Sequence, residues 1–168
     1  GAIGWVDGEN APIFDRVLTS ENGIEVIPQS NPAYTAKDNW KAMDYIVGGT
    51  PVLIRNGKVI KDFSPERTLT KFLTKKYSRT AVGITRKGAW VFIVIDGRFH
   101  GLIGGMKMSS LARFMQRLGC VEALNLDGGS SSTMVYENLV MNSPDGNIFE
   151  DGKSVTAVSD AIIVIPKL

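Results

Sequence analysis

Short apolar runs joined by tight polar turns constrain this fold more than any other feature of the sequence. Asn56-Gly57 lies between the apolar residues 51–54 and 59–60, and Asn-Gly in this position is a strong hairpin signal because both residues tolerate positive φ. Polar turns also separate residues 80–85 from 90–95 and residues 133–136 from 139–141. The sequence therefore predicts three hairpins. The run at 90–95 is so apolar that we expect both of its faces to be covered.

One segment shows helical periodicity instead. Four apolar side chains share one face of residues 109–118: Leu111, Phe114, Met115 and Leu118. Ser109 is a suitable N-cap, and Gly119 is a suitable end because glycine readily adopts the left-handed conformation that closes many helices. We predict a helix over residues 109–118 and two shorter ones at 37–45 and 69–73. The inward side chains at 37–45 are expected to be Trp40, Met43 and Tyr45.

The order of these elements predicts an α+β fold with a mixed, largely antiparallel sheet built from hairpins. Further short strands are expected at residues 13–18, 24–27, 122–126 and 161–165, and a glycine-rich loop at 97–107. Residues 1–47 are interrupted by Gly, Pro and Asn and form a poorly defined N-terminal segment. We therefore place the main domain at residues 48–168.

Composition excludes several classes of protein. The formal net charge is +2, and no long run of one sign occurs, so the sequence does not indicate a nucleic-acid-binding protein. No stretch of 18 apolar residues indicates a membrane span. The single Cys120 forbids an internal disulfide and is expected to be a buried thiol. One histidine and one cysteine argue against a zinc site.

The first candidate for chemistry is the polar segment that follows the strand at 122–126. Side chains alternate along a strand, so Asn125 and Asp127 point away from their leucine neighbours. Gly128 and Gly129 allow close backbone approach to a ligand and an anion-binding nest of N–H groups. Three hydroxyls follow that suit phosphate or sugar oxygens: Ser130, Ser131 and Ser132. An Asx turn followed by a polar loop explains the same residues without a ligand.

Three further groups are weaker candidates. Asp96-Gly97-Arg98 ends the most apolar run and either faces a ligand crevice or forms a surface turn. Arg79 leads into the strand at 80–85 and either clamps a phosphate with its two-pronged guanidinium or is solvated. His100 either reaches the site from the glycine-rich loop or is exposed to solvent there.

Taken in order, these stretches resemble the phosphodiester glycosidase family. The matching residues begin near 47 and run to the end of the chain. The specific ones are Arg79-Thr80-Ala81, Asp96-Gly97-Arg98 and Asn125-Leu126-Asp127-Gly128-Gly129, accompanied by residues 47–58, 105–106, 142–144 and 158–162. The chain departs from the family pattern in three places: Ser130 replaces a glycine, Thr156-Ala157 replaces an arginine-proline pair, and Asp160 replaces an asparagine.

The resemblance implies hydrolysis of a sugar-1-phosphodiester, which releases the sugar from a phosphate monoester. It implies Asp96, Asp127 and Arg98 as catalytic residues, and it leaves open a divalent cation such as Ca²⁺ or Mg²⁺ held by the two aspartates. The substrate-binding residues would be Arg79, His100, Asn125, Gly128, Gly129, Ser130, Ser131 and Ser132. Family habit also implies a secreted or cell-envelope location.

Two alternatives from other classes remain open at this point. One is a non-catalytic module that binds a sugar phosphate or envelope glycan in the same cleft, and the other is a structural subunit. Both are motivated by the departures at Ser130 and Thr156 and by the family's upstream asparagine-glycine-glycine-aromatic motif, which residues 1–47 lack. If that segment is missing, a sheet edge is left unpaired, and we expect the chain to associate with itself or with the missing segment.

Overall fold

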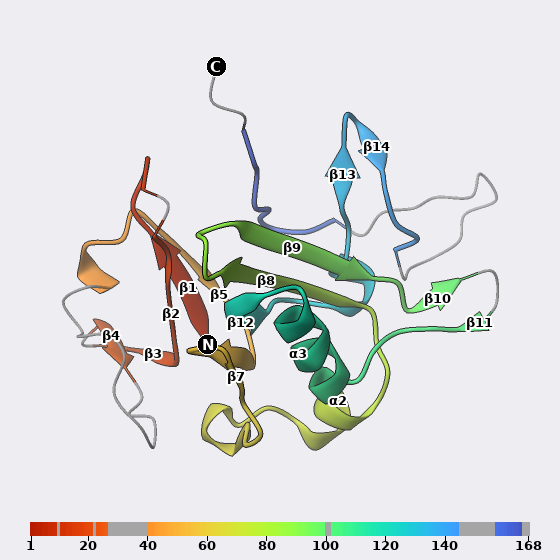
Figure 1. Ribbon diagram of the computed structural model, residues 1–168, viewed down its shortest axis with the longest axis horizontal. Helices are drawn as coiled ribbons and strands as arrows, with labels where there is room; N and C mark the ends of the chain where they lie inside the picture. The colour runs from red at the N-terminus through yellow and green to blue at the C-terminus, as the bar shows by residue number, and fades with distance from the viewer. Residues whose placement is uncertain (10, 22, 27–39, 100–101, 145–156, 166–168) are drawn as a thin grey trace.

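A five-stranded antiparallel sheet forms the centre of the fold (Figure 1). The computed structural model describes residues 1–9, 11–21, 23–26, 40–99, 102–144 and 157–165. The strands lie in the order β7 (Lys58–Val59), β6 (Val52–Arg55), β12 (Cys120–Asn125), β8 (Arg79–Thr85) and β9 (Trp90–Ile95). Two predicted hairpins, β6–β7 and β8–β9, are confirmed. Asn56 and Gly57 have the positive φ values, 48° and 74°, that the first turn requires.

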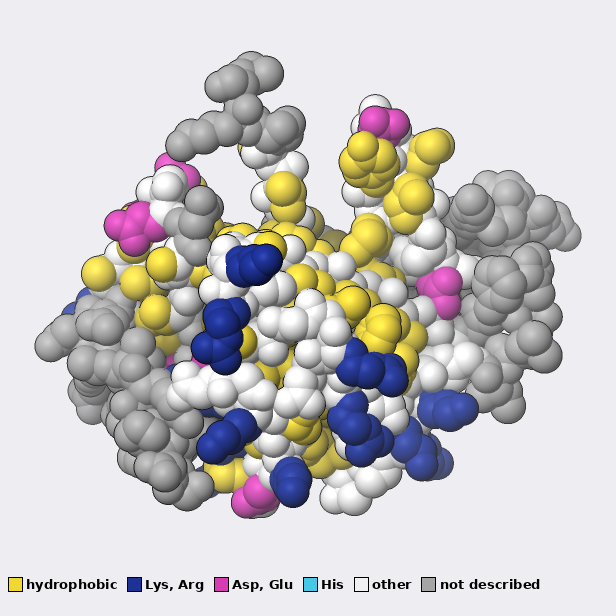
Figure 2. Space-filling model, in the orientation of Figure 1, with side chains coloured by type: hydrophobic (Ala, Val, Ile, Leu, Met, Phe, Trp, Pro, Cys, Tyr) yellow, Lys and Arg dark blue, Asp and Glu magenta, His cyan; other side chains and the backbone are white. Residues whose placement is uncertain are grey.

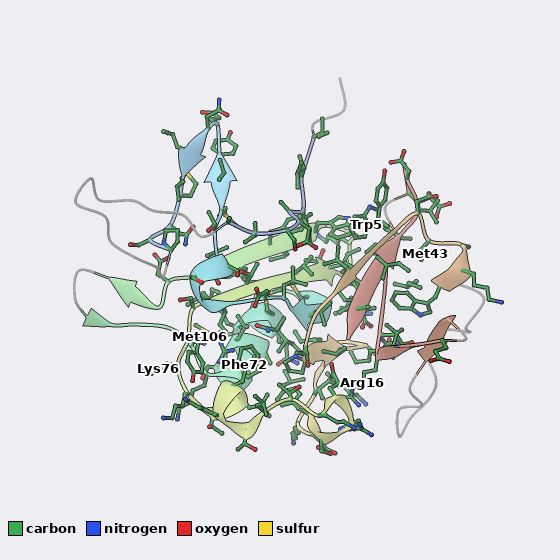
Figure 3. The ribbon with its side chains drawn as sticks, turned by 180° about the vertical axis from the view of Figure 1, so that it is seen from behind. Trp5, Arg16, Met43, Phe72, Lys76 and Met106 are labelled. Carbon is green, nitrogen blue, oxygen red and sulfur yellow. The ribbon has the colours of Figure 1, made fainter. Side chains whose placement is uncertain are left out.

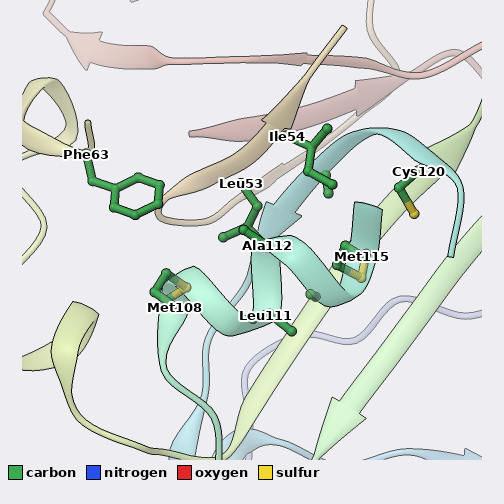
Figure 4. Packing of buried hydrophobic residues seen from close by; sticks show 10 residues of the cluster. Leu53, Ile54, Phe63, Met108, Leu111, Ala112, Met115 and Cys120 are labelled. Atoms are coloured by element: carbon green, nitrogen blue, oxygen red, sulfur yellow. The ribbon is translucent and has the colours of Figure 1, made fainter. Parts of the chain in front are cut away.

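Helix α3 (Met108–Arg117) covers one face of this sheet. Its buried side chains pack against Leu53, Ile54 and Ala123, as Figure 4 shows for part of the cluster. The predicted helix is confirmed, and Gly119 follows it with a φ of 87°. The prediction of Ser109 as N-cap was wrong, because the helix begins one residue earlier and its N-cap, Lys107, makes no side-chain capping bond. Leu118 is exposed, since it lies beyond the last helical residue.

A three-stranded antiparallel sheet covers the other face. Its order is β2 (Ile13–Asp15), β1 (Ala2–Trp5) and β5 (Tyr45–Gly48), and Ile3 and Phe14 pack against Val52, Val82 and Leu124. Two buried ion pairs tie the layers together: Arg55 with Asp15 at 3.4 Å and Arg16 with Glu66 at 2.9 Å. The sequence left residues 1–47 poorly defined, but β1 and β2 within this range belong to a packed layer, and the predicted boundary after residue 47 falls inside β5.

The N-terminal elements correct two other expectations. The strand expected at 13–18 is divided into β2 and β3 (Val17–Ser20), and β3 pairs with β4 (Gly23–Val26). In the segment expected to be helical at 37–45, residues 37–39 lie outside the described residues, Trp40 is helical and buried, and Tyr45 opens β5. Tyr45 is therefore not the inward side chain that was expected: it is exposed, and its ring stacks on Trp5 of the paired strand with centroids 5.4 Å apart.

The remaining elements are short. A 3₁₀ turn, η1 (Ser64–Glu66), and helix α2 (Thr70–Thr74) precede β8, and the expected loop at 97–107 contains β10 (Arg98–Phe99) and β11 (Leu102–Ile103). The third hairpin is confirmed as β13 (Val135–Tyr136) and β14 (Leu139–Val140). β9 is an edge strand with half-buried side chains, so the expectation of full cover was too strong.

The strand expected at residues 161–165 does not form. Among the described residues no strand pairs with this segment, and Ile163, Val164 and Ile165 are 77%, 71% and 80% exposed. An apolar run becomes a strand only where another strand accepts its hydrogen bonds, which local sequence does not reveal. The α+β class with a largely antiparallel sheet is confirmed. Within the described residues, no helix is long and apolar enough to span a bilayer.

Candidate functional site

Most of the candidate residues lie at one end of the central sheet, where β8 begins and β9 and β12 end. Arg79 at the start of β8 pairs with Ile95 at the end of β9, and Asn125 at the end of β12 pairs with Ala81. Asp96 and Asp127 therefore follow strands on either side of β8. Neighbouring strands lie about 4.8 Å apart, and β9 and β12 are separated by two such spacings. The backbones of these two strands are therefore roughly 10 Å apart.

Asp96 is held in place from the segment after the third hairpin. Its Oδ1 accepts hydrogen bonds from Asn142 Nδ2 at 3.0 Å and from the backbone N–H of Ser143 at 2.9 Å. Asn142 also donates to the Ser132 carbonyl at 2.9 Å and accepts a bond from the Met134 N–H. Asn142 thus joins Asp96 to the Gly128–Ser132 loop. The second carboxylate oxygen of Asp96 has no hydrogen-bond partner among the described residues.

The loop at residues 128–132 lies across the start of β8. Gly129 N–H donates to the Ser78 carbonyl at 3.2 Å, and a Cβ on Gly128 would lie 2.8 Å from that same oxygen, so only glycine fits there. A short 3₁₀ turn, η2 (Gly129–Ser131), follows, and the buried Ser132 hydroxyl accepts a bond from Thr80 Oγ1 at 3.1 Å. The glycines therefore serve close packing against β8.

The backbone of this loop is less available to an anion than the sequence suggested. The N–H of Gly128 donates to Asp127 Oδ1, and the N–H of Gly129 donates to the Ser78 carbonyl. The N–H groups of Ser131 and Ser132 donate to the carbonyls of Gly128 and Gly129, respectively. The hydroxyls of Ser130 and Ser131 have no hydrogen bond to the described residues. Donors to a ligand would thus come from these side chains, while the backbone keeps the loop in shape.

Asp127 and Asn125 occupy different environments. Asp127 is exposed, and its Oδ1 accepts the 2.8 Å bond from Gly128 N–H that is typical of an Asx turn. Asn125 is buried, and its Nδ2 donates to the carbonyls of Thr50 and Leu126, both at 2.7 Å. Its Oδ1 is buried and accepts no hydrogen bond from the residues that the structure describes. Asn125 anchors the end of β12, whereas Asp127 is open to solvent and to a ligand.

Arg79 does not present its guanidinium to solvent. The side chain is fully buried and donates from Nε to the Met106 carbonyl at 2.9 Å and from one Nη to the carbonyls of Phe72 and Lys75. The guanidinium lies over the Phe72 ring, with 4.4 Å from Cζ to the centroid. Its other Nη is buried and has no hydrogen-bond partner in the described part of the chain. Burial lowers the pKa of Arg79 to about 10, so it is charged at neutral pH. This geometry fits a residue that joins α2, β8 and Met106.

The other predicted site residues are only partly placed. Arg98 opens β10, two residues after Asp96, and His100 lies outside the described residues. The described residues include no cluster of three or more His, Cys, Asp or Glu side chains that could hold a metal ion. Two surface hollows of about 460 and 520 Å³ lie elsewhere, around Ile84–Gly88 and around Lys61–Leu73, and neither is lined by Asp96 or Asp127.

Sequence reasoning assigned no role to two residues of this network, Thr80 and Asn142. Both stand inside stretches that carry the family resemblance, Arg79-Thr80-Ala81 and residues 142–144. The resemblance therefore could have marked these two positions, but it could not reveal their hydrogen-bond partners. Asn142 lies 46 residues from Asp96, and Thr80 lies 52 residues from Ser132.

Comparisons with known proteins identify the family of this chain. A family model described as phosphodiester glycosidase matches residues 10–165. The N-acetylglucosamine-1-phosphodiester alpha-N-acetylglucosaminidases of Bos taurus and Homo sapiens are 30% and 31% identical over 108 residues. The match covers 59% of this chain and 20% and 21% of theirs, so the chain spans about a fifth of the length of these relatives.

Two solved structures share the fold. A hypothetical protein from Synechocystis superposes with a TM-score of 0.57 at 25% identity, over 72% of this chain and 24% of that one. The zebrafish N-acetylglucosamine-1-phosphodiester alpha-N-acetylglucosaminidase catalytic domain, auto-inhibited by its pro-peptide, superposes with a TM-score of 0.56 at 21% identity, over 85% of this chain and 44% of that one. Since the family model covers nearly the whole sequence, the chain belongs to the phosphodiester glycosidase family.

Proposed function

We propose that this chain hydrolyses a sugar-1-phosphodiester and releases the sugar from a phosphate monoester. The observation that carries the proposal is the position of Asp96. It is fixed by Asn142 and the Ser143 N–H beside the Gly128–Ser132 loop, and its other carboxylate oxygen has no hydrogen-bond partner among the described residues. Family membership supports the hydrolytic class of reaction.

The reaction places few demands on the protein. Water adds its OH to the anomeric carbon, the carbon–oxygen bond to phosphate breaks, and the second proton of water goes to solvent or to the phosphate. A phosphate monoester is a stable anion, so stabilising its charge can replace part of the protonation that an ordinary glycoside needs. Arg98 and the hydroxyls of Ser130 and Ser131 would supply that stabilisation.

We assign the base role to one of the two aspartates. Asp127 is exposed and can approach a ligand, and Asp96 is oriented by its hydrogen bonds. A carboxylate on each side of the scissile bond is the usual arrangement in glycosidases. The same pair is our candidate for holding a divalent cation, although the described residues offer no third acidic or histidine ligand beside them.

The test is an assay on the methyl phosphodiester of N-acetylglucosamine 1-phosphate and matching esters of other sugars, with release of free sugar as the readout. We expect Asp127→Asn and Asp96→Asn to lose about 10²–10⁴-fold in activity. Asp7→Asn, at an exposed aspartate near the end of β1, is the matched control and should leave turnover unchanged. Full activity in both site variants would refute the assignment.

A non-catalytic sugar-phosphate binding module is the second candidate. It is favoured by the use of Arg79 and of four loop N–H groups in bonds within the protein. Thermal stabilisation by the intact ester without any release of sugar would establish this function instead. Neither stabilisation nor turnover on any ester would favour a structural subunit. The extracellular or envelope location implied by the family is part of the same proposal, and it predicts that the native protein is exported.

A further inference from the structure

Positive charge is concentrated in one part of the chain. Residues 67–121 contain eleven Lys and Arg residues and a single acidic residue, Asp96, whereas the rest of the chain contains eight basic and sixteen acidic residues. The small net charge of +2 therefore conceals a strong internal separation. Such a separation produces a local positive potential that a balanced surface does not have.

The fold gathers many of these cations on the face that carries α2 and α3. Six of them, which we call the basic face, are exposed: Lys71, Lys75, Lys76, Lys107, Arg113 and Arg117. α2 packs against α3, and the bridge between Tyr77 and Met106 places Lys76 and Lys107 next to each other on paired segments. Figure 2 shows Lys and Arg side chains spread over this side of the molecule, with Asp and Glu near the edges of the view.

Within the described residues, no acidic side chain pairs with the basic face. None of its six side chains takes part in a salt bridge there, whereas Gly1, Arg16 and Arg55 form ion pairs with Glu66, Asp15 and Glu122. The hollow of about 520 Å³ beside α2 adds Lys61 and Arg67, together with Asp62. Uncompensated cations repel one another, so an anionic ligand would relieve their repulsion.

The basic face borders the candidate site. Lys76 lies two residues before Ser78, whose carbonyl accepts the bond from Gly129, and Lys107 follows Met106, whose carbonyl accepts the bond from Arg79. Figure 3 shows Phe72, Lys76 and Met106 close together at one end of the molecule. Cations and candidate catalytic groups thus share the end of the sheet at which β8 begins.

We propose that the basic face binds further phosphodiester groups of a polymeric substrate, a repeating sugar-phosphate chain, while one linkage of that chain lies at the candidate site. This inference rests on the proposed function and specifies its substrate class. A single-stranded nucleic acid fits less well, because base stacking requires exposed aromatic rings. The large exposed aromatic side chains among the described residues, Tyr45 and Tyr136, lie on β5 and β13 instead.

Long-chain inorganic polyphosphate is the binding probe. We compare the parent with a variant carrying Lys75→Gln, Lys76→Gln and Lys107→Gln, and with a matched control, Arg86→Gln with Lys87→Gln, at the β8–β9 turn. Loss of three phosphate contacts should reduce the slope of log affinity against log salt by about 2 and weaken binding at low salt by roughly tenfold or more. The control should keep a near-parental slope, and melting curves verify that all variants are folded.

Three results would overturn the inference. These are absence of salt-dependent polyphosphate binding by the parent, equal binding by the triple variant, and tighter binding of phosphatidylglycerol vesicles or a single-stranded oligonucleotide than of polyphosphate. Turnover of the small methyl phosphodiester separates the two proposals, because the triple variant should hydrolyse it as the parent does. Weakened polyphosphate binding by the triple variant in a protein that hydrolyses no ester would support the basic face and overturn the proposed function.

Discussion

Replacing Arg79 by methionine tests whether this residue supports the fold or binds phosphate. Arg79 is fully buried, and methionine keeps the unbranched stem of the side chain in that position while removing the guanidinium. It removes the donors to three backbone carbonyls, those of Phe72, Lys75 and Met106. These carbonyls belong to α2, to its C-cap and to the segment before α3, so the change affects how three elements meet.

The expected cost follows from those three bonds. A buried acceptor left without a donor costs about 1–3 kcal/mol, and bonds from a charged donor are at the upper end of the range. Part of this cost is recovered, because the folded state no longer has to bury a charge. We expect a net destabilisation of about 2–4 kcal/mol. At about 2–4 °C per kcal/mol for a chain of this size, the Tm should fall by roughly 5–15 °C.

The assay is thermal unfolding followed by circular dichroism, with Arg113→Met as the matched control. Arg113 is an exposed arginine on α3, and its replacement should change stability by less than about 0.5 kcal/mol. Arg79→Lys keeps the charge but loses the two-pronged geometry, so its Tm should lie between those of the parent and Arg79→Met. A parental Tm in Arg79→Met, combined with loss of activity, would refute the supporting role and restore Arg79 as a phosphate ligand.

Three further changes test other parts of the structure. Asn142→Asp places a second carboxylate against Asp96, so the variant should be less stable than the parent at neutral pH. Its stability should recover as the pH falls toward about 4, because protonation removes the repulsion between the two carboxylates. Equal losses of stability at both pH values would contradict this. Burial raises the pKa of Glu122, so the folded state binds this proton more tightly than the unfolded state does, and the group's contribution to stability is lost as the pH rises. Glu122→Gln should flatten that pH dependence in urea titrations. Self-association through the exposed 163–165 segment predicts a sedimentation coefficient that rises with concentration, and Ile163→Lys with Ile165→Lys should abolish the rise; a parent that stays monomeric rules it out.

Local patterns determined the elements whose stability depends on near neighbours. The turn at Asn56-Gly57, the β8–β9 hairpin, α3 and the third hairpin could all be predicted, because backbone conformation and side-chain periodicity act over a few residues. The family resemblance indicated that Asp96, Asp127 and the stretches around them belong to the same candidate site. The sequence alone could not predict that the N-terminal strands form a layer over Val52 and Leu124, since that packing depends on contacts far apart in the chain.

Only the tertiary structure decided what the polar candidates do. The sequence left Arg79 as either a phosphate ligand or a solvated side chain, and its burial follows from how α2 and Met106 enclose it. Asn142 acquires its position because the end of β9 and the segment after β14 converge. The apolar run at 161–165 reads as a strand but finds no partner among the described residues. Hydrogen bonding and burial depend on residues dozens of positions away, so residue type sets what a side chain can do and the fold selects among those options.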